Sequence, residues 1–335
     1  MKYRIFAVLV LTVLVLNLGG STLADSKGKK TGAGDLVSLL PASDGVVTLD
    51  VKRFFAEAMP RLLASNQSML TDITTHLDKF QEQTGIDVRK FEYIAAGINV
   101  RKGNEKNADG DPVVIARGQI SSASLIGAAK LVSNAKYTEE HFGERTIYIF
   151  SHLTGGSGTD NKVQVPSVVA VTAIDQWTIA FGTPARVRQT LEGKSRIGVD
   201  LTTLLERTPT AVVSFATKIP PGTKTLLPME NDELGKSIDS IQYIYGNADV
   251  GVDNASLHVT ARTLLNAQAK SLHETLEGLQ MIGKGILGGA KGVDKQVFAR
   301  MIDNVKFSVR ANEVMFDLVV PQSDIDIIVG SLKQK

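Results

Sequence analysis

The sequence predicts an α+β protein that consists of two duplicated units, each a mainly antiparallel sheet with helices packed on one face. The first observation is a strand that ends in Ala-Arg and precedes a helix, present at 114–117 and again at 259–262. The second is the phase of the two helices that follow. In both, apolar residues step by four and then by three, which places them on one helical face: Leu125, Ala129 and Val132, then Leu272, Leu276 and Leu279.

The third observation is that the flanking elements repeat in the same order. A leucine-rich turn opens each unit, LLPASDGVVTLDV from Leu39 and LLERTPTAVVSFA from Leu204. Stretches rich in β-branched and aromatic residues then precede the Ala-Arg strands, at 91–95 and 241–245. A hairpin follows each helix, formed by 168–173 with 177–181 and by 305–309 with 314–320. We therefore place the two units at 35–193 and 197–333, with Arg117 and Arg262 at matching strand ends.

A capped helix closes each unit. In the first, Thr183 is the expected N-cap, Pro184 takes the first helical position and Gly193 ends the helix. In the second, Ser323 with Asp326 three residues later is typical of a capping box.

The units differ in their inserted helices. The first has a helical passage at 52–83, which we expect Pro60 to interrupt. The second has PPGTKTLLPMENDELG from Pro220 instead, and its prolines permit little helix. The helix after the second Ala-Arg strand extends toward Gly288, so we expect it to cover the sheet that the shorter segment leaves bare.

The N-terminus, residues 1–24, has the pattern of a secretory signal peptide. Lys2 and Arg4 precede an uncharged apolar run at 5–18, and small residues end at Ala24. The run is shorter than the ~20 residues of a membrane-spanning helix, so we expect cleavage after Ala24 rather than a retained anchor. Residues 25–34 read as a disordered linker. The expected location is periplasmic or extracellular.

Cysteine is absent from the sequence, which excludes a lipidated N-terminal cysteine and any disulfide. The chain has 37 basic and 35 acidic residues, and loss of Lys2 and Arg4 with the signal peptide balances the two signs. Nucleic-acid binding depends on clustered cationic charge, so we expect no nucleic-acid partner.

The opening of the mature chain resembles a family of exported bacterial proteins that is known only as a domain of unknown function. The resemblance covers mainly residues 36–100 and depends on the Leu-Leu-Pro turn at 39–41 and on the Thr-Gly-Ile-Asp turn at 84–87. It implies an envelope location and a duplicated α+β fold, and it brings no catalytic residues.

Two glycine-containing loops invite a ligand but lack part of the required pattern. The loop HLTGGSGTDNK at 152–162 precedes a strand, whereas a phosphate cradle needs a helix directly after the glycines. Its Ser157 also lacks the spacing of a nucleophile elbow. The segment NEKNADGDP at 104–112 resembles half of a calcium loop, but the twelfth position is Ala116 instead of glutamate. We interpret both segments as solvated connections.

The histidines do not form a recognisable metal motif. His141 lies among Glu139, Glu140 and Glu144 without a second histidine at ligand spacing, and we interpret 138–145 as the outer face of a helix end. His273-Glu274 lacks the second histidine of a zinc protease, because residue 277 is glutamate. We expect no catalytic residue, metal or cofactor.

The apolar stretch MIGKGILGGAKG at 281–292 has the composition of a membrane-surface helix, but glycine at five of its positions disfavours a stable one. Close packing on the sheet followed by a loop explains it equally well, so membrane contact is not expected. Trp177, Phe307 and Val309 are expected in the core.

The expected function is that of a non-enzymatic exported envelope protein, a binding or structural module with a possible groove between its two units. Its partner would be another envelope protein or an apolar ligand. Two alternatives remain open: a hydrolase with a Ser/His site built across the units, and a carrier of an apolar ligand, which would need a cavity of several hundred Å³.

Overall fold

The fold comes from a computed structural model of the chain, which describes residues 32–101, 109–133, 136–151, 168–208, 210–220, 232–288 and 292–331. The predicted signal peptide at 1–24 and most of the predicted linker lie outside these residues. The first two residues of helix α2 (Ala33–Val37) fall within the predicted linker.

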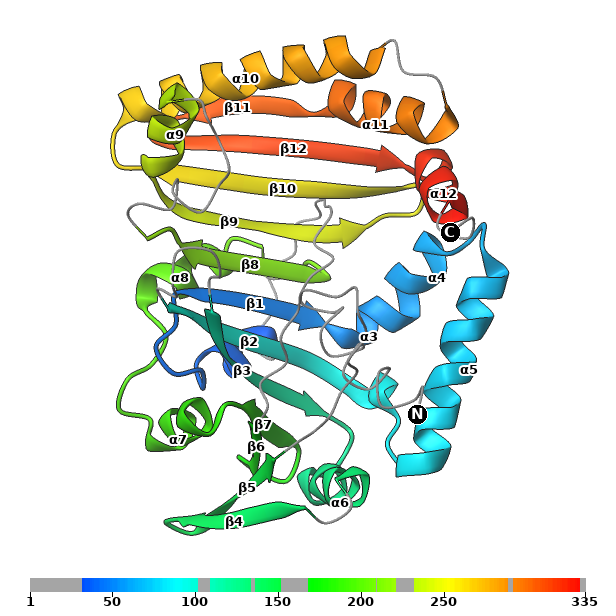
Figure 1. Cartoon of the computed structure of the whole chain (residues 1–335), viewed down its shortest axis with the longest axis vertical. Coiled ribbons are helices and arrows are strands. Elements are labelled where there is room, and N and C mark those ends of the chain that lie inside the picture. Colours follow the sequence, from blue (N-terminus) through cyan, green and yellow to red (C-terminus); the bar gives the residue numbers. More distant parts are fainter. Residues whose placement is uncertain are drawn as a thin grey trace.

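The strands of the described residues form one sheet of 12, in the order β11-β12-β10-β9-β8-β1-β2-β3-β7-β6-β5-β4 (Figure 1). The strands before residue 185 are β1 (Gly45–Asp50), β2 (Phe91–Arg101), β3 (Asp109–Gly118), β4 (Tyr137–Phe142), β5 (Arg145–Ser151), β6 (Val168–Ala173) and β7 (Thr178–Gly182). The later strands are β8 (Val213–Lys218), β9 (Ile241–Val250), β10 (Asn254–Thr263), β11 (Lys306–Arg310) and β12 (Glu313–Pro321). Each ladder is antiparallel, which confirms the predicted α+β class with a mainly antiparallel sheet.

The helices lie between these strands and along the ends of the sheet. After α2 and before β4 they are α3 (Val51–Arg53), the π-helix η1 (Phe54–Ala58), α4 (Met59–Leu62), α5 (Gln67–Thr84), the 3-10 helix η2 (Val88–Lys90) and α6 (Ser122–Val132). After β7 they are α7 (Pro184–Glu192), α8 (Val199–Leu205), α9 (Asp232–Asp239), α10 (Asn266–Gly288), α11 (Val293–Asn304) and α12 (Gln322–Ser331).

Helices cover both faces of the sheet, so the expectation of helices on one face is wrong. The paired residues Ala95 and Ile115 pack in one cluster with α2 and α8. Their neighbours along the strands, Ile94 and Ala116, are also paired and pack against α6 in a different cluster. Successive side chains of a strand point to opposite faces. Because these central strands are apolar at both parities, each face needs its own cover.

We name the two faces after these helices. The α2 face also carries α7, whose Val187 packs on Ile147 and Ala170. The α6 face also carries α10 and α12, whose apolar residues pack on side chains of β12 such as Val314 and Leu318.

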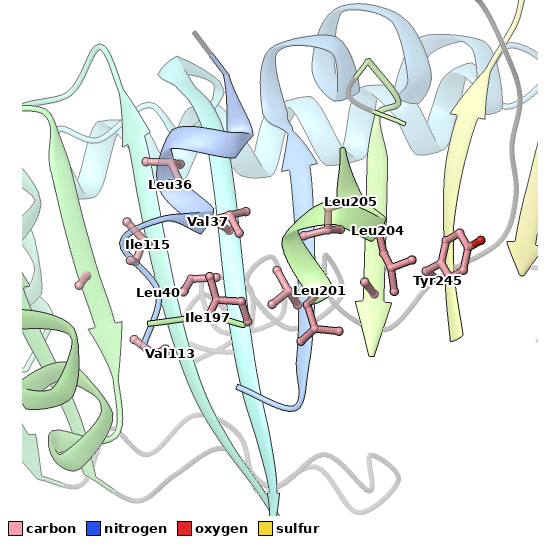
Figure 2. Close-up of a cluster of buried hydrophobic side chains, with 14 residues drawn as sticks. Leu36, Val37, Leu40, Val113, Ile115, Ile197, Leu201, Leu204, Leu205 and Tyr245 are labelled. Atoms are coloured by element: carbon pink, nitrogen blue, oxygen red, sulfur yellow. The ribbon is translucent and has the colours of Figure 1, made fainter. Parts of the chain in front are cut away.

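The junction between the two predicted units is a continuous part of the sheet. Strands β1 and β8 pair from Gly45 opposite Thr217 to Leu49 opposite Val213. Figure 2 shows α2 and α8 on the same side of these strands, with their leucines in one buried cluster. The cluster therefore fills this face of the junction, where a groove between the units was one expectation.

Arg186 of α7 is the largest fully buried side chain of the described residues, with 1% of its surface exposed. Its guanidinium donates to the carbonyl oxygen of Ala42 at 2.8 Å, to Ser43 Oγ at 2.5 Å and to Gln189 Oε1 at 2.9 Å. These hydrogen bonds fix the connection between α2 and β1 against α7.

The capped helix of the first unit is confirmed. Helix α7 starts at Pro184, the Thr183 hydroxyl accepts from the amide of Arg186 at 3.4 Å, and Gly193 ends the helix with φ of 65°. Glycine tolerates this left-handed conformation without a side-chain clash.

The predicted capping box of the second unit is wrong, because α12 already begins at Gln322 and Ser323 lies inside it.

The break in the first helical passage lies elsewhere than predicted. Pro60 is the second residue of α4, which follows the π-helix η1 without a gap, so the helical run passes through this proline. The chain breaks after Leu63 instead, and Asn66 caps α5 by accepting from the amide of Met69 at 3.2 Å.

The second unit contains more helix than its prolines suggested. Residues 221–231 lie outside the described residues, but α9 starts at Asp232, so the expectation of little helix is wrong for the end of that stretch. Helix α10 runs to Gly288, as expected from its sequence.

Candidate interaction surface

The loops singled out in the sequence fall largely outside the described chain. The glycine-rich loop at 152–162 lies entirely outside it. In the segment at 104–112 that resembles half of a calcium loop, residues 104–108 lie outside it. Asp111 lies in β3 and is buried, where its Oδ1 accepts from the hydroxyl of Thr183 at 2.5 Å. This bond ties β3 to the start of α7.

Residues 138–145 form the hairpin of β4 and β5, so their interpretation as a helix end is wrong. Glu139 accepts from Lys130 Nζ at 3.1 Å, and Glu140 binds Arg188 through two bonds of 2.6 Å and 2.5 Å. The hydrogen bonds from Arg188 hold the pKa of Glu140 below its usual value. Within the described part of the chain, no three His, Cys, Asp or Glu side chains are grouped to hold a metal ion.

His258 of β10 contacts the carboxylate of Asp317 on β12 through Nδ1. Its Nε2 is buried and has no hydrogen-bond partner. A Ser-His nucleophile pair needs a hydroxyl at that nitrogen. The pair therefore joins two strands without the arrangement that the hydrolase alternative requires, and the sequence spacing gave no signal for it.

Arg262, at the end of the second Ala-Arg strand, belongs to a charged cluster on the α2 face. It donates to Glu313 Oε1 from Nε at 2.8 Å and from Nη2 at 2.6 Å. Tyr245 donates its hydroxyl to the same oxygen at 2.9 Å, and Arg207 Nη1 lies 3.2 Å away. Both arginines also lie over the Tyr245 ring, at 5.1 Å and 5.6 Å from its centre.

The pKa of Glu313 lies below its usual value. Burial raises it, but the hydrogen bonds from Arg262 and Tyr245 and the charge of Arg207 outweigh burial. A carboxylate with a lowered folded pKa stabilises the protein above its unfolded pKa, and this contribution is lost as pH falls through the folded pKa.

Replacing Glu313 by glutamine should therefore lower the free energy of unfolding at pH 7. The difference from wild type should shrink as pH falls below about 4.3, the usual pKa of glutamate. Urea titrations at a series of pH values measure both. A difference that stays constant down to pH 2 would contradict the assigned role of the Glu313 charge.

A stripe of bulky apolar side chains on α10 is exposed. We define the α10 stripe as Leu279, Ile282 and Ile286, which are 41%, 60% and 71% exposed. They are spaced by three and four residues and therefore share one face of the helix. Met281 beside them is 73% exposed, and Phe298 on α11 is 49% exposed.

The stripe is exposed because the rest of α10 is already held from other sides. Its first half packs Ala269 and Leu272 against the sheet. In its second half, Gln280 donates to the carbonyl oxygens of Ile302 and Val305 at 2.7 Å and 2.9 Å. Figure 1 shows α10 running along β11 at the edge of the sheet, with α11 beside it. Helix α11 thus contacts α10 away from the stripe.

Two glycines, Gly278 and Gly285, flank the stripe on the helix. A Cβ atom built at either position meets nothing within 4 Å. Packing inside the chain therefore does not require glycine there, although each glycine costs the helix up to ~1 kcal/mol relative to alanine. The expected close packing of this stretch on the sheet is wrong for its helical part, because α10 runs to Gly288 and its Met281, Ile282 and Ile286 are exposed. No helix of the described residues is long and apolar enough to cross a membrane.

Three residues expected in the core are exposed instead. Leu279 belongs to the stripe, Trp177 is 46% exposed in the turn between β6 and β7, and Val309 is 38% exposed on the edge strand β11. Phe307 is partly buried, with its ring 5.6 Å from that of Phe316. The exposure of the α10 stripe could not be predicted from the sequence, because the spacing of its residues matches that of a helix that faces the core.

Comparison with known proteins gives a likeness to solved structures. No protein-family model matches the chain, and no curated protein sequence matches it. Crystal form III of TP0453 is 11% identical, with a TM-score of 0.45 over 91% of this chain and 100% of that chain. Crystal form I of TP0453 is 11% identical, with a TM-score of 0.44 over 88% of this chain and 96% of that chain.

Proposed function

We propose that the chain is a non-enzymatic, exported binding module that docks to a protein partner through the α10 stripe. The observation that carries this proposal is the exposure of three aliphatic side chains on one helical face. Burying a side chain of this size is worth about 1.5–3 kcal/mol, so a stripe left in water favours association. Contiguous exposed apolar patches on soluble proteins mark interaction sites.

The exported location is part of the proposal and is supported by the sequence. The charged start, apolar run and small residues of 1–24 have the order of a signal peptide. The lack of cysteine leaves the fold independent of disulfide formation in whichever exported compartment it occupies.

We also propose that the two halves of the sheet arose by duplication. Read outward from the junction, the strand orders β1-β2-β3-β7-β6 and β8-β9-β10-β12-β11 correspond strand by strand. The elements between them also correspond, because α6 and α10 follow β3 and β10, and α7 and α12 follow β7 and β12.

The register of the strands supports the same proposal. Arg117 pairs with Tyr93 on one side and with Thr178, the first residue of β7, on the other. Arg262 pairs in the same way with Tyr243 and with Glu313, the first residue of β12. In both halves the ladder shifts register directly beyond the arginine and tyrosine pair.

The docking proposal is tested by the mass of the native assembly. Tagged protein is extracted from its own cells without denaturation and sized, for wild type and for the double variant Ile282→Asp, Ile286→Asp. We expect wild type in an assembly larger than one chain, and the variant at the mass of a single chain, because buried unpaired carboxylates oppose docking. An unchanged melting temperature of the variant serves as the control for folding. Equal masses for both proteins would overturn the proposal.

A further inference from the structure

We infer that the partner of the α10 stripe is a second copy of this chain, whose α10 lies antiparallel to the first with Ile282 at the two-fold axis. This inference rests on the proposed docking function and names its occupant. Closed two-fold dimers are the commonest form of soluble homo-oligomer, and their interface pairs one surface with itself.

The sizes of the residues along α10 fit this pairing. With Ile282 opposite Ile282, Leu279 is level with Gly285 of the second copy, and Ile286 is level with its Gly278. At each of these levels one helix contributes a bulky side chain and the other contributes a glycine. Only one of the two helices therefore carries a bulky side chain at each level, and the edge of the contact that holds the glycines is left open for the two backbones to approach.

The sides on which these residues lie also fit. Each residue of a helix is rotated by about 100° from the one before it, so Leu279 and Ile286 lie on one side of Ile282 and the glycines lie on the other. Under the two-fold rotation, the bulky residues of both copies meet along one edge of the contact. The glycines of both copies meet along the other edge, where the two backbones come together.

The charges along α10 do not oppose the contact. Lys284 is level with Gln280 of the second copy, and within its own chain it lies 3.3 Å from Asp303. Glu277 is exposed and lies on the far side of the helix from Ile282. No like charges are therefore brought opposite one another along the described part of α10.

The glycines distinguish a close-packed helix from other occupants. A Cβ added at Gly278 or Gly285 meets no atom of the same chain within 4 Å. Their small size has no use inside the monomer, but it has one where another backbone approaches. The α10 of a second copy supplies both the backbone for these glycines and the bulky stripe that lies beside them.

Single cysteines test the geometry, because the natural sequence contains none. The purified Ile282→Cys chain, treated with the thiol oxidant diamide, should form a disulfide-linked dimer in most molecules. Met281→Cys is the matched control, since Met281 is 73% exposed but lies about 100° around the helix from Ile282. It should give at least ten-fold less dimer.

The direction of the pairing is tested with two further variants. When the purified Leu279→Cys and Ile286→Cys chains are mixed, they should cross-link to each other. The cysteine at 279 of one copy and the cysteine at 286 of the other lie on the same edge of the contact, about one residue apart along the helix axis. Each alone should cross-link poorly. A parallel contact gives the reverse result, with strong self-linking of each variant, and would overturn the antiparallel pairing.

The size of Gly285 is tested by Gly285→Leu, followed by sedimentation of the purified chain over a range of concentrations. We expect dimerisation at least ten-fold weaker than in wild type, with a melting temperature that is unchanged or higher, because the site is open in the monomer. Gly127→Leu on α6, where a Cβ atom likewise meets nothing within 4 Å, adds the same bulk away from α10 and should dimerise as wild type.

The two proposals fail in different ways. A purified chain that stays monomeric at all concentrations, while the native assembly still depends on the stripe, overturns the second copy as partner and leaves the docking function intact. A monomer that instead floats with phosphatidylglycerol vesicles through the stripe identifies a lipid surface and also overturns the second copy. A native assembly that is indifferent to the stripe overturns both.

Discussion

Replacing Arg186 by methionine should lower the free energy of unfolding by about 1–3 kcal/mol. The methionine fills most of the volume, so the loss comes from polar partners rather than from a cavity. The hydroxyl of Ser43, a residue that is 7% exposed, accepts from this guanidinium and loses that donor in a buried place, whereas the carbonyl oxygen of the exposed Ala42 can turn to water. A buried polar group left without a partner costs about 1–3 kcal/mol.

Arg188→Met is the matched control, two residues along the same helix. Arg188 is 38% exposed, and its partner Glu140 is 33% exposed, so water replaces the lost ion pair. Urea unfolding of the two variants under the same conditions should show a small loss for Arg188→Met beside the large one for Arg186→Met. Similar losses for the two arginines would mean that Arg186 does not anchor the connection between α2 and β1.

Truncating Leu272 to alanine should cost about 2–5 kcal/mol. Leu272 is 2% exposed and packs with Ala269 and Val314, where α10 lies on the sheet. The truncation removes apolar contacts and leaves a cavity that the rigid sheet cannot close. Chemical denaturation measures the loss directly.

Glu274→Ala controls for the effect of substitution in this part of α10. Glu274 is exposed, so its loss should change the free energy of unfolding by less than about 0.5 kcal/mol. Equal and small changes for Leu272→Ala and Glu274→Ala would mean that the first half of α10 does not pack on the sheet, and the role assigned to its exposed second half would fail with it.

Single elements could be predicted from the sequence wherever local patterns were strong. The 168–173 strand has the predicted bounds, and Arg117 and Arg262 each lie one residue before the end of a strand, in β3 and β10. A further signal was available and missed. The pattern Asp-Leu-x-x-Leu-Leu occurs at 35–40 and at 200–205, around α2 and α8, and these leucines form the buried cluster of the junction.

Which surfaces are covered could not be predicted, because periodicity does not report the partner of an apolar face. Leu272 and Leu279 stand in the same phase of α10, yet one is buried and the other is exposed. The difference depends on where the sheet and α11 contact the helix. The cover on both faces of the sheet, by contrast, could have been predicted, because the central strands are apolar at both parities.

Local rules failed where a longer-range contact decided the boundary. Ser323 has the spacing of a cap, but the chain turns into α12 one residue earlier, where the amide of Gln322 donates to the carbonyl oxygen of Asp253 at 2.9 Å. The side chain of Gln322 also donates to the carbonyl oxygen of Arg61 at 2.9 Å. These contacts come from parts of the chain far from the helix and leave no trace in its own sequence.

The central claim, that a partner covers the α10 stripe, is tested most directly by thiol labelling of the protein in its own cells. Two single variants are compared: Ile286→Cys on the stripe, and Val252→Cys in the turn between β9 and β10, which are 71% and 77% exposed in the single chain. The rate of reaction with a maleimide polymer is measured in each, with and without the added change Ile282→Asp.

We expect the cysteine at 286 to react at least ten-fold more slowly without Ile282→Asp than with it, because the partner covers it. The cysteine at 252 should react at the same rate in both. Equal rates for the cysteine at 286 with and without Ile282→Asp would show that the stripe is open to solvent in the cell, and would contradict the proposed function.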